Sequence, residues 1–205
     1  MQVLFIRHGQ SEANVLGAFS NRGWKHPLTD TGRAQVRKLA EALRGRGISA
    51  LLSSPLKRAV ESAEILGEAL GVRHEVAQAL VEYDVGTHEG RNDAESWQAY
   101  AEVEQRWAAG ELTARLEGGE SCEDIRNRFV PFVRELIARF GKEPATLAII
   151  GHGGTFRHSL PIVLGNVDEA FCRTHGLPNT AVVEAVLEDG RLFCTRWHET
   201  ILRNH

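Results

Sequence analysis

An arginine and a histidine follow directly after the first apolar segment, and their side chains could bind an anion and do nucleophilic or acid–base chemistry. Residues 3–6 read Val-Leu-Phe-Ile, which is typical of a buried strand, and Arg7, His8 and Gly9 come next. Arginine fits phosphate or carboxylate with a planar fork of donors, and imidazole can react near neutral pH. Ligands of open α/β sheets bind beyond the carboxyl ends of the strands, where these residues would lie. On three residues alone, a capping arginine beside a core histidine is an equal alternative.

Two further predicted strands end in groups of the same kind. The apolar run at 50–53 leads into a helix whose first turns contain Arg58, and the run at 145–150 ends at His152 and Gly153. Because the carboxyl ends of parallel strands meet at one edge of a sheet, these groups are expected to lie together. Two arginines, two histidines and glycine amides at a helix amino terminus form a suitable cradle for a tetrahedral dianion.

The elements that must position these residues alternate between strand and helix. Pro131 lies inside an apolar helical pattern, and we expect it to kink that helix or to mark a later start. The alternation predicts a three-layer α/β/α sandwich with a mainly parallel central sheet and an antiparallel edge. Helices are predicted from Thr29 or Asp30 to Leu43, from a Ser54 cap to about Leu70, over 92–109, around 125–137 and from about Thr155 to Leu164, with further strands at 73–76, 181–187 and 191–197.

Composition limits the class of protein and its partners. The 205 residues are 42% hydrophobic and 25% charged, which is typical of one globular domain spanning residues 1–205. A net charge of −3 speaks against a nucleic-acid partner, because such proteins usually carry a broad basic surface. A bound anion must therefore be held by a local cluster of positive groups.

The cysteines and the apolar runs indicate the compartment. Cys122, Cys172 and Cys194 are odd in number and lack a C-x-x-C pair, so neither a disulfide framework nor a zinc site is predicted. A reducing cytoplasmic location fits this usage, and no run has the length of a signal sequence or a membrane span. The histidines lack the spacing of helical metal sites, so no metal is expected. A homodimer is left open.

With these motifs in view, the chain resembles the histidine phosphatase superfamily, which includes cofactor-dependent phosphoglycerate mutases and many small-molecule phosphatases. The resemblance covers most of the chain. It rests on Arg7-His8-Gly9 with Asn14, on Pro27-Leu28-Thr29 with Gly32 and Gln35, on Ser53 through Arg58-Ala59, on Leu80-Val81-Glu82 with Gly86 and Glu89-Gly90, on Gly118 to Ser121, and on His152-Gly153-Gly154.

The resemblance implies a phosphoglycerate mutase-like fold and a catalytic role for five residues. His8 would attack phosphorus and carry the phosphoryl group until water removes it. Arg7, Arg58 and His152 would hold the equatorial oxygens, and Glu82 would protonate the leaving oxygen and then activate water. Neither a metal nor another cofactor is implied, because arginine supplies the positive charge.

Around the pocket rim, some predicted roles have alternatives and several residues differ from the family pattern. Asp84, Glu89 and Glu120 are alternatives to Glu82 as the acid, and Asn14 could simply fix its loop. The family pattern usually has threonine at Ser11, glutamate at Gln10, aspartate at His26 and an aromatic residue at Thr87-His88. The residues predicted to bind substrate are Gln10, Ser11, Asn14, Gly23 and Gly153.

The segment after the acid motif could form a helical, lid-like insertion at about 85–120. Trp97, Tyr100 and Trp107 have helical spacing there, which is more typical of core residues than of ligand contacts, whereas Trp24 could reach the pocket from the first long loop.

Three functions are weighed. The leading one is a metal-independent phosphomonoesterase acting on a small phosphorylated metabolite. The second is a phosphoglycerate mutase, which shares the catalytic residues but typically reads Glu-Arg-His-Tyr-Gly where this chain reads Glu-Tyr-Asp-Val-Gly at 82–86. That difference favours hydrolysis. The third is an inactive protein that binds phosphorylated ligands or protein partners, against which the complete set of catalytic residues argues.

Overall fold

A seven-stranded sheet is the centre of the computed structural model, which describes residues 1–202. The strand order is β3-β2-β4-β1-β5-β6-β7. The first four strands of this order pair in parallel and the rest pair antiparallel, which confirms the predicted sheet. The strands are β1 (Gln2–Arg7), β2 (Ile48–Ser53), β3 (His74–Val76), β4 (Thr146–Gly151), β5 (Val182–Glu188), β6 (Arg191–Trp197) and β7 (Thr200–Ile201).

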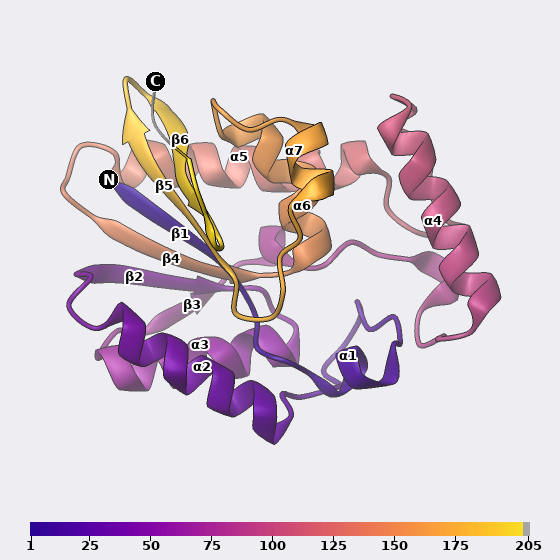
Figure 1. Ribbon diagram of the computed structural model, residues 1–205, viewed down its shortest axis with the longest axis horizontal. Coiled ribbons are helices and arrows are strands. Elements are labelled where there is room, and N and C mark those ends of the chain that lie inside the picture. The colour runs from indigo at the N-terminus through magenta and orange to yellow at the C-terminus, as the bar shows by residue number, and fades with distance from the viewer. Residues whose placement is uncertain (203–205) are drawn as a thin grey trace.

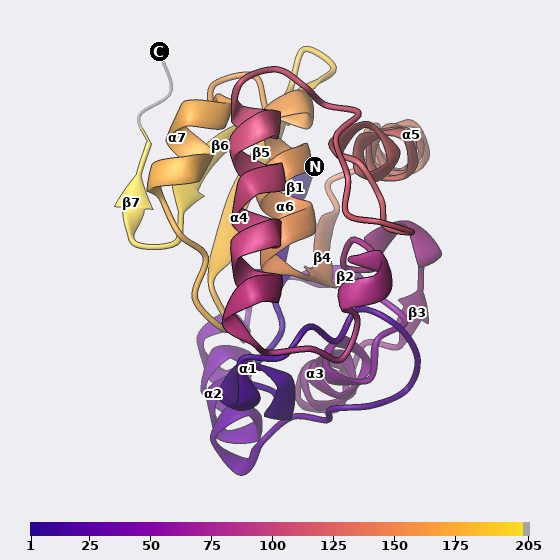
Figure 2. The same ribbon diagram turned by 90° about the vertical axis from the view of Figure 1, so that its right-hand side faces the viewer.

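Helices cover both faces of the sheet, so the predicted three-layer sandwich is confirmed (Figures 1 and 2). One face packs against α2 (Asp30–Leu43) and α3 (Lys57–Leu70). The other face packs against α5 (Cys122–Phe140), α6 (Gly153–Val163) and α7 (Glu169–Thr174). In the part of the chain that the structure describes, no helix is both long and apolar enough to cross a membrane.

The alternation of side chains along β1 explains the two cores. Leu4 and Ile6 belong to the core under α2 and α3, whereas Val3 and Phe5 belong to the core on the opposite face. Phe5 meets the ring of Phe156 edge-on, with 5.7 Å between ring centroids. Because successive strand residues point to opposite faces, an uninterrupted apolar run such as 3–6 must be buried on both sides.

Two helices begin elsewhere than the sequence predicted. α3 starts at Lys57 after Leu56, because the hydroxyl of Ser54 accepts a hydrogen bond from the Leu56 amide and shapes a turn before the helix. α5 begins at Cys122 and continues through Pro131, so the predicted late start is wrong, whereas the predicted kink stays a prediction. The helix starts this early because Ser121, the residue before it, and Asp124 exchange side-chain to backbone hydrogen bonds in a capping box.

Short elements were not predicted from the pattern, since they contain too few residues to show a period. They are α1 (Glu12–Leu16), α7, β7 and the 3₁₀ turns Gln78–Leu80 and Gly86–His88. α6 begins at Gly153, two residues before the predicted start. This earlier start matters, because it brings the first amides of α6 to the end of β4.

The predicted insertion contains one helix that packs beside the sandwich. α4 (Ala94–Ala108) begins at Asp93, whose carboxylate accepts a hydrogen bond from the Ser96 amide at 3.0 Å. Its Val103 and Trp107 belong to a third apolar cluster, separate from the two cores of the sheet. Figure 1 shows α4 at one side of the sandwich. The movement of this segment as a lid stays a prediction.

Gly86 holds the two ends of this insertion together. Its φ is +61°, and a Cβ at this position would lie 1.8 Å from the backbone oxygen of Glu117. The next residue, Thr87, donates its amide to the same oxygen at 2.9 Å. A side chain at residue 86 would therefore be strained by the left-handed backbone and would collide with the backbone of Glu117.

Replacing Gly86 by alanine should lower the free energy of unfolding by at least about 2 kcal/mol, because the left-handed backbone and the close approach both resist a side chain. Urea unfolding measures this loss. Gly90→Ala is the matched control, since Gly90 also has positive φ but a Cβ there meets no atom within 4 Å. Equal losses in the two variants would contradict the role given to the close approach.

Candidate active site

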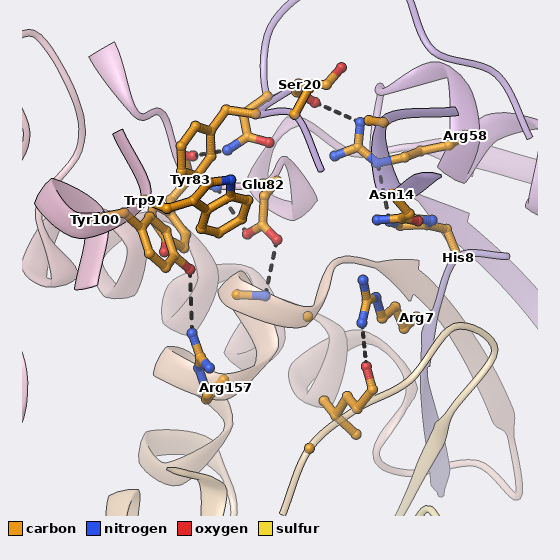
Figure 3. Close-up of a pocket in the computed structure, with 18 of the residues that line it drawn as sticks. Arg7, His8, Asn14, Ser20, Arg58, Glu82, Tyr83, Trp97, Tyr100 and Arg157 are labelled. Carbon is orange, nitrogen blue, oxygen red and sulfur yellow. Dashed lines mark hydrogen bonds between the residues drawn. The ribbon is translucent and has the colours of Figure 1, made fainter. Parts of the chain in front are cut away.

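The carboxyl ends of three parallel strands meet where the sequence predicted. β1 pairs with β4 so that Arg7 lies opposite Gly151, and β2 pairs with β4 so that Ser53 lies opposite Ile150. This register brings His8 close to the residue that follows β4, His152. A cavity of about 380 Å³ opens at this edge of the sheet (Figure 3).

His8 presents one ring nitrogen to its neighbours as an acceptor. Its Nδ1 lies 2.7 Å from the carbonyl oxygen of Gly9, which can only accept, so Nδ1 carries the proton. Its Nε2 accepts a hydrogen bond from Nε of Arg58 at 3.1 Å. Burial, and then the charges of Arg58 and Arg7, lower the pKa of His8 well below its usual value. The imidazole is therefore neutral and keeps a lone pair on Nε2, as a nucleophile requires.

Two arginines supply positive charge beside this imidazole. Arg58 is 5% exposed, and its Nη1 donates to the carbonyl oxygen of Ser20 at 2.6 Å. Burial lowers the pKa of Arg58 to about 10, which still leaves it charged at neutral pH. Nη1 of Arg7 donates to the carbonyl oxygen of Leu177 at 2.6 Å, while its buried Nε has no hydrogen-bond partner among residues 1–202. Both guanidinium groups are thus fixed in direction by backbone carbonyls.

His152 lies behind this cradle. It is fully buried, its Nε2 lies 2.7 Å from the hydroxyl oxygen of Ser54, and its ring centroid is 5.0 Å from that of His8. Burial, with the charges of Arg58 and other neighbours, lowers its pKa well below the usual value. Within the described chain it does not line the cavity itself, so its contact with a substrate stays a prediction.

Glu82 faces the cavity from the segment before α4. Its carboxylate accepts hydrogen bonds from the amide of Gly154 at 3.0 Å and from the amide of Thr155 at 2.7 Å. The hydroxyl of Thr155 donates to it as well, at 2.9 Å. The first turn of α6 therefore fixes the orientation of this carboxyl group.

The alternative acids are engaged elsewhere. Asp84 pairs with Arg22 at 2.7 Å, Glu89 pairs with Lys25 at 2.9 Å, and Glu120 pairs with Arg128 at 2.8 Å. None of the three carboxylates is among the described residues that line the cavity. This geometry favours Glu82 as the acid.

The residues predicted to bind substrate fall into two groups. Asn14 and Gly153 line the cavity, and Oδ1 of Asn14 accepts hydrogen bonds from Ser11 and from Asn179 at 3.1 Å each. Asn14 thus fixes its loop as well as facing the cavity.

Gln10, Ser11 and Gly23 are not among the described residues that line the cavity, so their contact with a substrate stays a prediction. The Gln10 side chain accepts from the hydroxyl of Thr29 at 2.8 Å, and Ser11 is buried at the start of α1. Gly23 is exposed in the following loop. Trp24 is also 61% exposed and outside the lining, so it does not reach the pocket.

Other residues that line the cavity were not predicted to do so, or were predicted to lie in the core. Arg157 lines the cavity from α6, and its position one turn after Gly153 is a signal that helical periodicity could have revealed. Trp97 and Tyr100 also line the cavity, although their spacing predicted core positions. Trp107 does lie in the core, as predicted.

The described residues hold no group of three or more His, Cys, Asp or Glu side chains that could bind a metal ion. The cavity lining instead combines four arginines with one carboxylate, Glu82. This arrangement can bind a dianion through guanidinium groups and can transfer a proton through one carboxyl group.

Comparisons with known proteins bear out the family resemblance. A family model of the histidine phosphatase superfamily (branch 1) matches residues 3–200. A bifunctional protein of Mycobacterium tuberculosis (strain ATCC 25618 / H37Rv) is 33% identical over 175 residues, 85% of this chain and 47% of that protein. The chain therefore spans about half the length of this relative.

Other relatives are similar over most of their length. Putative phosphoserine phosphatase 2 of Hydrogenobacter thermophilus is 27% identical over 187 residues, 91% of this chain and 90% of that protein. A 2,3-bisphosphoglycerate-dependent phosphoglycerate mutase of Azorhizobium caulinodans is 31% identical over 162 residues, 76% of this chain and 77% of that protein. The relatives thus include a protein named as a phosphatase and a protein named as a phosphoglycerate mutase.

Among solved structures, a mycobacterial glucosyl-3-phosphoglycerate phosphatase in complex with VO3 is 25% identical. Its TM-score is 0.82, and the match covers 97% of this chain and 99% of that chain. The arrangement of elements described above is therefore shared with a solved phosphatase structure.

The lowered pKa values of the two histidines predict how stability depends on pH. Below about pH 6.5 the unfolded chain protonates His8 and His152 while the folded chain leaves them neutral. The free energy of unfolding should therefore be largest above pH 6.5 and fall as the pH is lowered to 5, by up to about 1.4 kcal/mol per pH unit for each group. Urea unfolding of the wild type and of His152→Gln in phosphate-free buffer measures the slope. An identical slope in the variant would contradict the assignment.

Proposed function

Because the chain belongs to the histidine phosphatase superfamily (branch 1), we propose that it is a metal-independent phosphomonoesterase that hydrolyses a small phosphorylated metabolite. The reaction passes through a phosphohistidine on His8. One observation carries the proposal: a neutral imidazole with a lone pair on Nε2 lies beside the buried Arg58 and the half-buried Arg7, in a cavity that also holds a carboxyl group.

In the first step, Nε2 of His8 attacks phosphorus in line with the ester oxygen. The P–N bond forms, the P–O bond to the alcohol breaks, and the protonated carboxyl of Glu82 gives its proton to the leaving oxygen. Arg7 and Arg58 hold the phosphoryl oxygens and stabilise the charge that develops on them. Backbone carbonyls already orient both guanidinium groups. When Nε2 attacks, the hydrogen bond that it accepts from Nε of Arg58 must break, which frees that N–H for a phosphoryl oxygen.

In the second step, water attacks the phosphohistidine from the side that the alcohol has left. The carboxylate of Glu82 takes a proton from this water, the P–N bond breaks, and His8 regains its neutral form. Inorganic phosphate then leaves the cradle. The amides of Gly154 and Thr155 keep Glu82 in one place through both steps, because they bond to its two oxygens.

Asp84 does not decide between a phosphatase and a mutase. Facing inward, it would repel a polyanionic metabolite, but its carboxylate pairs with Arg22 outside the cavity lining. The preference for hydrolysis therefore rests on the sequence at 82–86, which departs from the mutase pattern.

His8→Ala should reduce phosphate release from a simple monoester by on the order of 10³-fold or more, because the phosphohistidine of the proposed mechanism can then not form. Acid-labile phosphate trapped on the wild type should be absent from the variant. His74→Ala, at the edge strand β3, is the control and should retain activity. Circular dichroism checks that both variants are folded.

The outcomes separate the three candidate functions. Full activity in His8→Ala would overturn the proposed mechanism. Rapid interconversion of 2- and 3-phosphoglycerate that depends on a bisphosphate primer, with little free phosphate, would identify a mutase. Absence of both turnover and phosphoenzyme in the wild type would identify an inactive binding protein.

Glu82→Gln should lower kcat/KM for an alkyl phosphate by on the order of 10²-fold, but much less for a nitrophenyl ester, whose leaving group hardly needs a proton. Asp84→Asn is the matched control, since it makes the same carboxylate-to-amide change outside the cavity. Equal losses on both esters in Glu82→Gln would indicate damaged binding and would count against the acid role.

A further inference from the structure

The cavity extends beyond the groups that hold the phosphate, and three aromatic side chains line it there. We name Phe19, Trp97 and Tyr100 the aromatic wall. In Figure 3, Trp97 and Tyr100 lie on the other side of Glu82 from His8. The ring centroids of Phe19 and Trp97 are 4.4 Å apart, and those of Trp97 and Tyr100 are 5.4 Å apart. The hydrolysis steps use none of these rings.

The aromatic wall is fixed in place before any ligand binds. Nε1 of Trp97 donates to the carbonyl oxygen of Gly17 at 2.9 Å, and the ring of Tyr83 stacks on Tyr100 with an interplanar angle of 13°. Phe19 is 5% exposed and packs behind the other rings, whereas Trp97 stays 42% exposed. A rigid ring with an open face binds a flat or apolar group with little loss of side-chain entropy.

The arginine beside the aromatic wall does not present a free positive charge. Nη2 of Arg157 pairs with Oε1 of Glu104, which also accepts from Nε2 of His158 at 3.0 Å and from the Tyr83 hydroxyl at 3.1 Å. Burial raises the pKa of Glu104, but the hydrogen bond from His158 and the charge of Arg157 outweigh it and lower that pKa to about 2. Glu104 is therefore ionised and balances Arg157.

The remaining arginine of the lining, Arg173, is expected to bind an anion more weakly. The side chain of Arg173 is 44% exposed at the rim, so solvent and salt screen its charge. Among the described residues, Arg7 and Arg58 at the phosphate cradle form no ion pair with a carboxylate, and only the charge of Glu82 in the same cavity acts on both. The far end of the cavity favours a neutral group.

Resting on the proposed phosphatase function, we propose that the aromatic wall is the subsite for the leaving group and that the substrate is the phosphomonoester of an alcohol bearing an uncharged ring. With the phosphate between Arg7 and Arg58, the ester oxygen faces Glu82 and the ring lies on Trp97. A cavity of about 380 Å³ has room for both parts of such a molecule.

Three phosphates of primary alcohols test this subsite without large differences in leaving group: benzyl phosphate, ethyl phosphate and 3-phosphoglycerate. We expect kcat/KM for benzyl phosphate to exceed that for the other two by about tenfold or more. Trp97→Ala should lower kcat/KM for benzyl phosphate by about tenfold and change that for ethyl phosphate by less than about twofold. Trp97→Phe should keep most of the preference, because it keeps a ring.

Trp24→Ala is the matched control, since Trp24 is exposed and outside the cavity lining. It should leave the benzyl-to-ethyl ratio unchanged. Equal losses on both esters in Trp97→Ala and in Trp97→Phe would overturn the proposal, and so would a higher kcat/KM for 3-phosphoglycerate than for benzyl phosphate.

Binding of non-hydrolysable phosphonates separates this proposal from the proposed function. Calorimetry should show that benzylphosphonate binds the wild type about tenfold more tightly than ethylphosphonate and that Trp97→Ala removes the difference. If the phosphonates show this preference while no ester is hydrolysed, the phosphatase function fails and the subsite stands. If both esters are hydrolysed equally well and both phosphonates bind equally, the subsite fails and the phosphatase function stands.

Discussion

A charged guanidinium buried against a neutral imidazole is the contact on which the candidate site depends. Arg58 donates to His8 at 3.1 Å, and a backbone carbonyl, with no carboxylate, accepts its other hydrogen bond. Burial of a charge without an opposite charge is costly, and the two apolar cores that hold the sheet together must supply the free energy for it. Together with burial of the ring, the charge of Arg58 lowers the pKa of His8, and Arg58 provides a fixed positive charge that an anion can neutralise.

The cavity has a charged end and an aromatic end, and this division follows from the same cost of burying a positive charge without an ion-pair partner. Among the described residues, Arg7 and Arg58, which would hold the phosphate, form no ion pair with a carboxylate, whereas Arg157, farther along the cavity, is balanced by Glu104. α4 carries Trp97 and Glu104 on consecutive parts of one helix, so the insertion contributes both the open ring and the balancing carboxylate. The strand ends and the insertion therefore contribute different groups to one cavity.

Local patterns in the sequence predicted the sheet and the catalytic cradle well, because both depend on which residues end a strand. Arg7, His8 and Arg58 could be placed from apolar runs and helix signals alone. Contacts between distant segments could not be placed in this way. The pairing of Arg157 with Glu104 and the hydrogen bond from Arg7 to Leu177 depend on how loops approach in space. Gln10 and Ser11 were predicted to bind substrate from their positions in the motif. Those positions do not show that the two side chains form hydrogen bonds with other protein side chains.

The place of β1 in the sheet has a consequence for the synthesis of the chain. β1 comprises residues 2–7, yet its two neighbours in the sheet are β4 and β5, residues 146–151 and 182–188. The segment that orients Arg7, at Leu177, also comes late. His8 and β1 therefore leave the ribosome early, and β1 waits with an apolar run exposed until its neighbours, up to residue 188, have emerged. Insertion of β1 between β4 and β5 is thus a late step of folding, since both neighbours lie in the second half of residues 1–202.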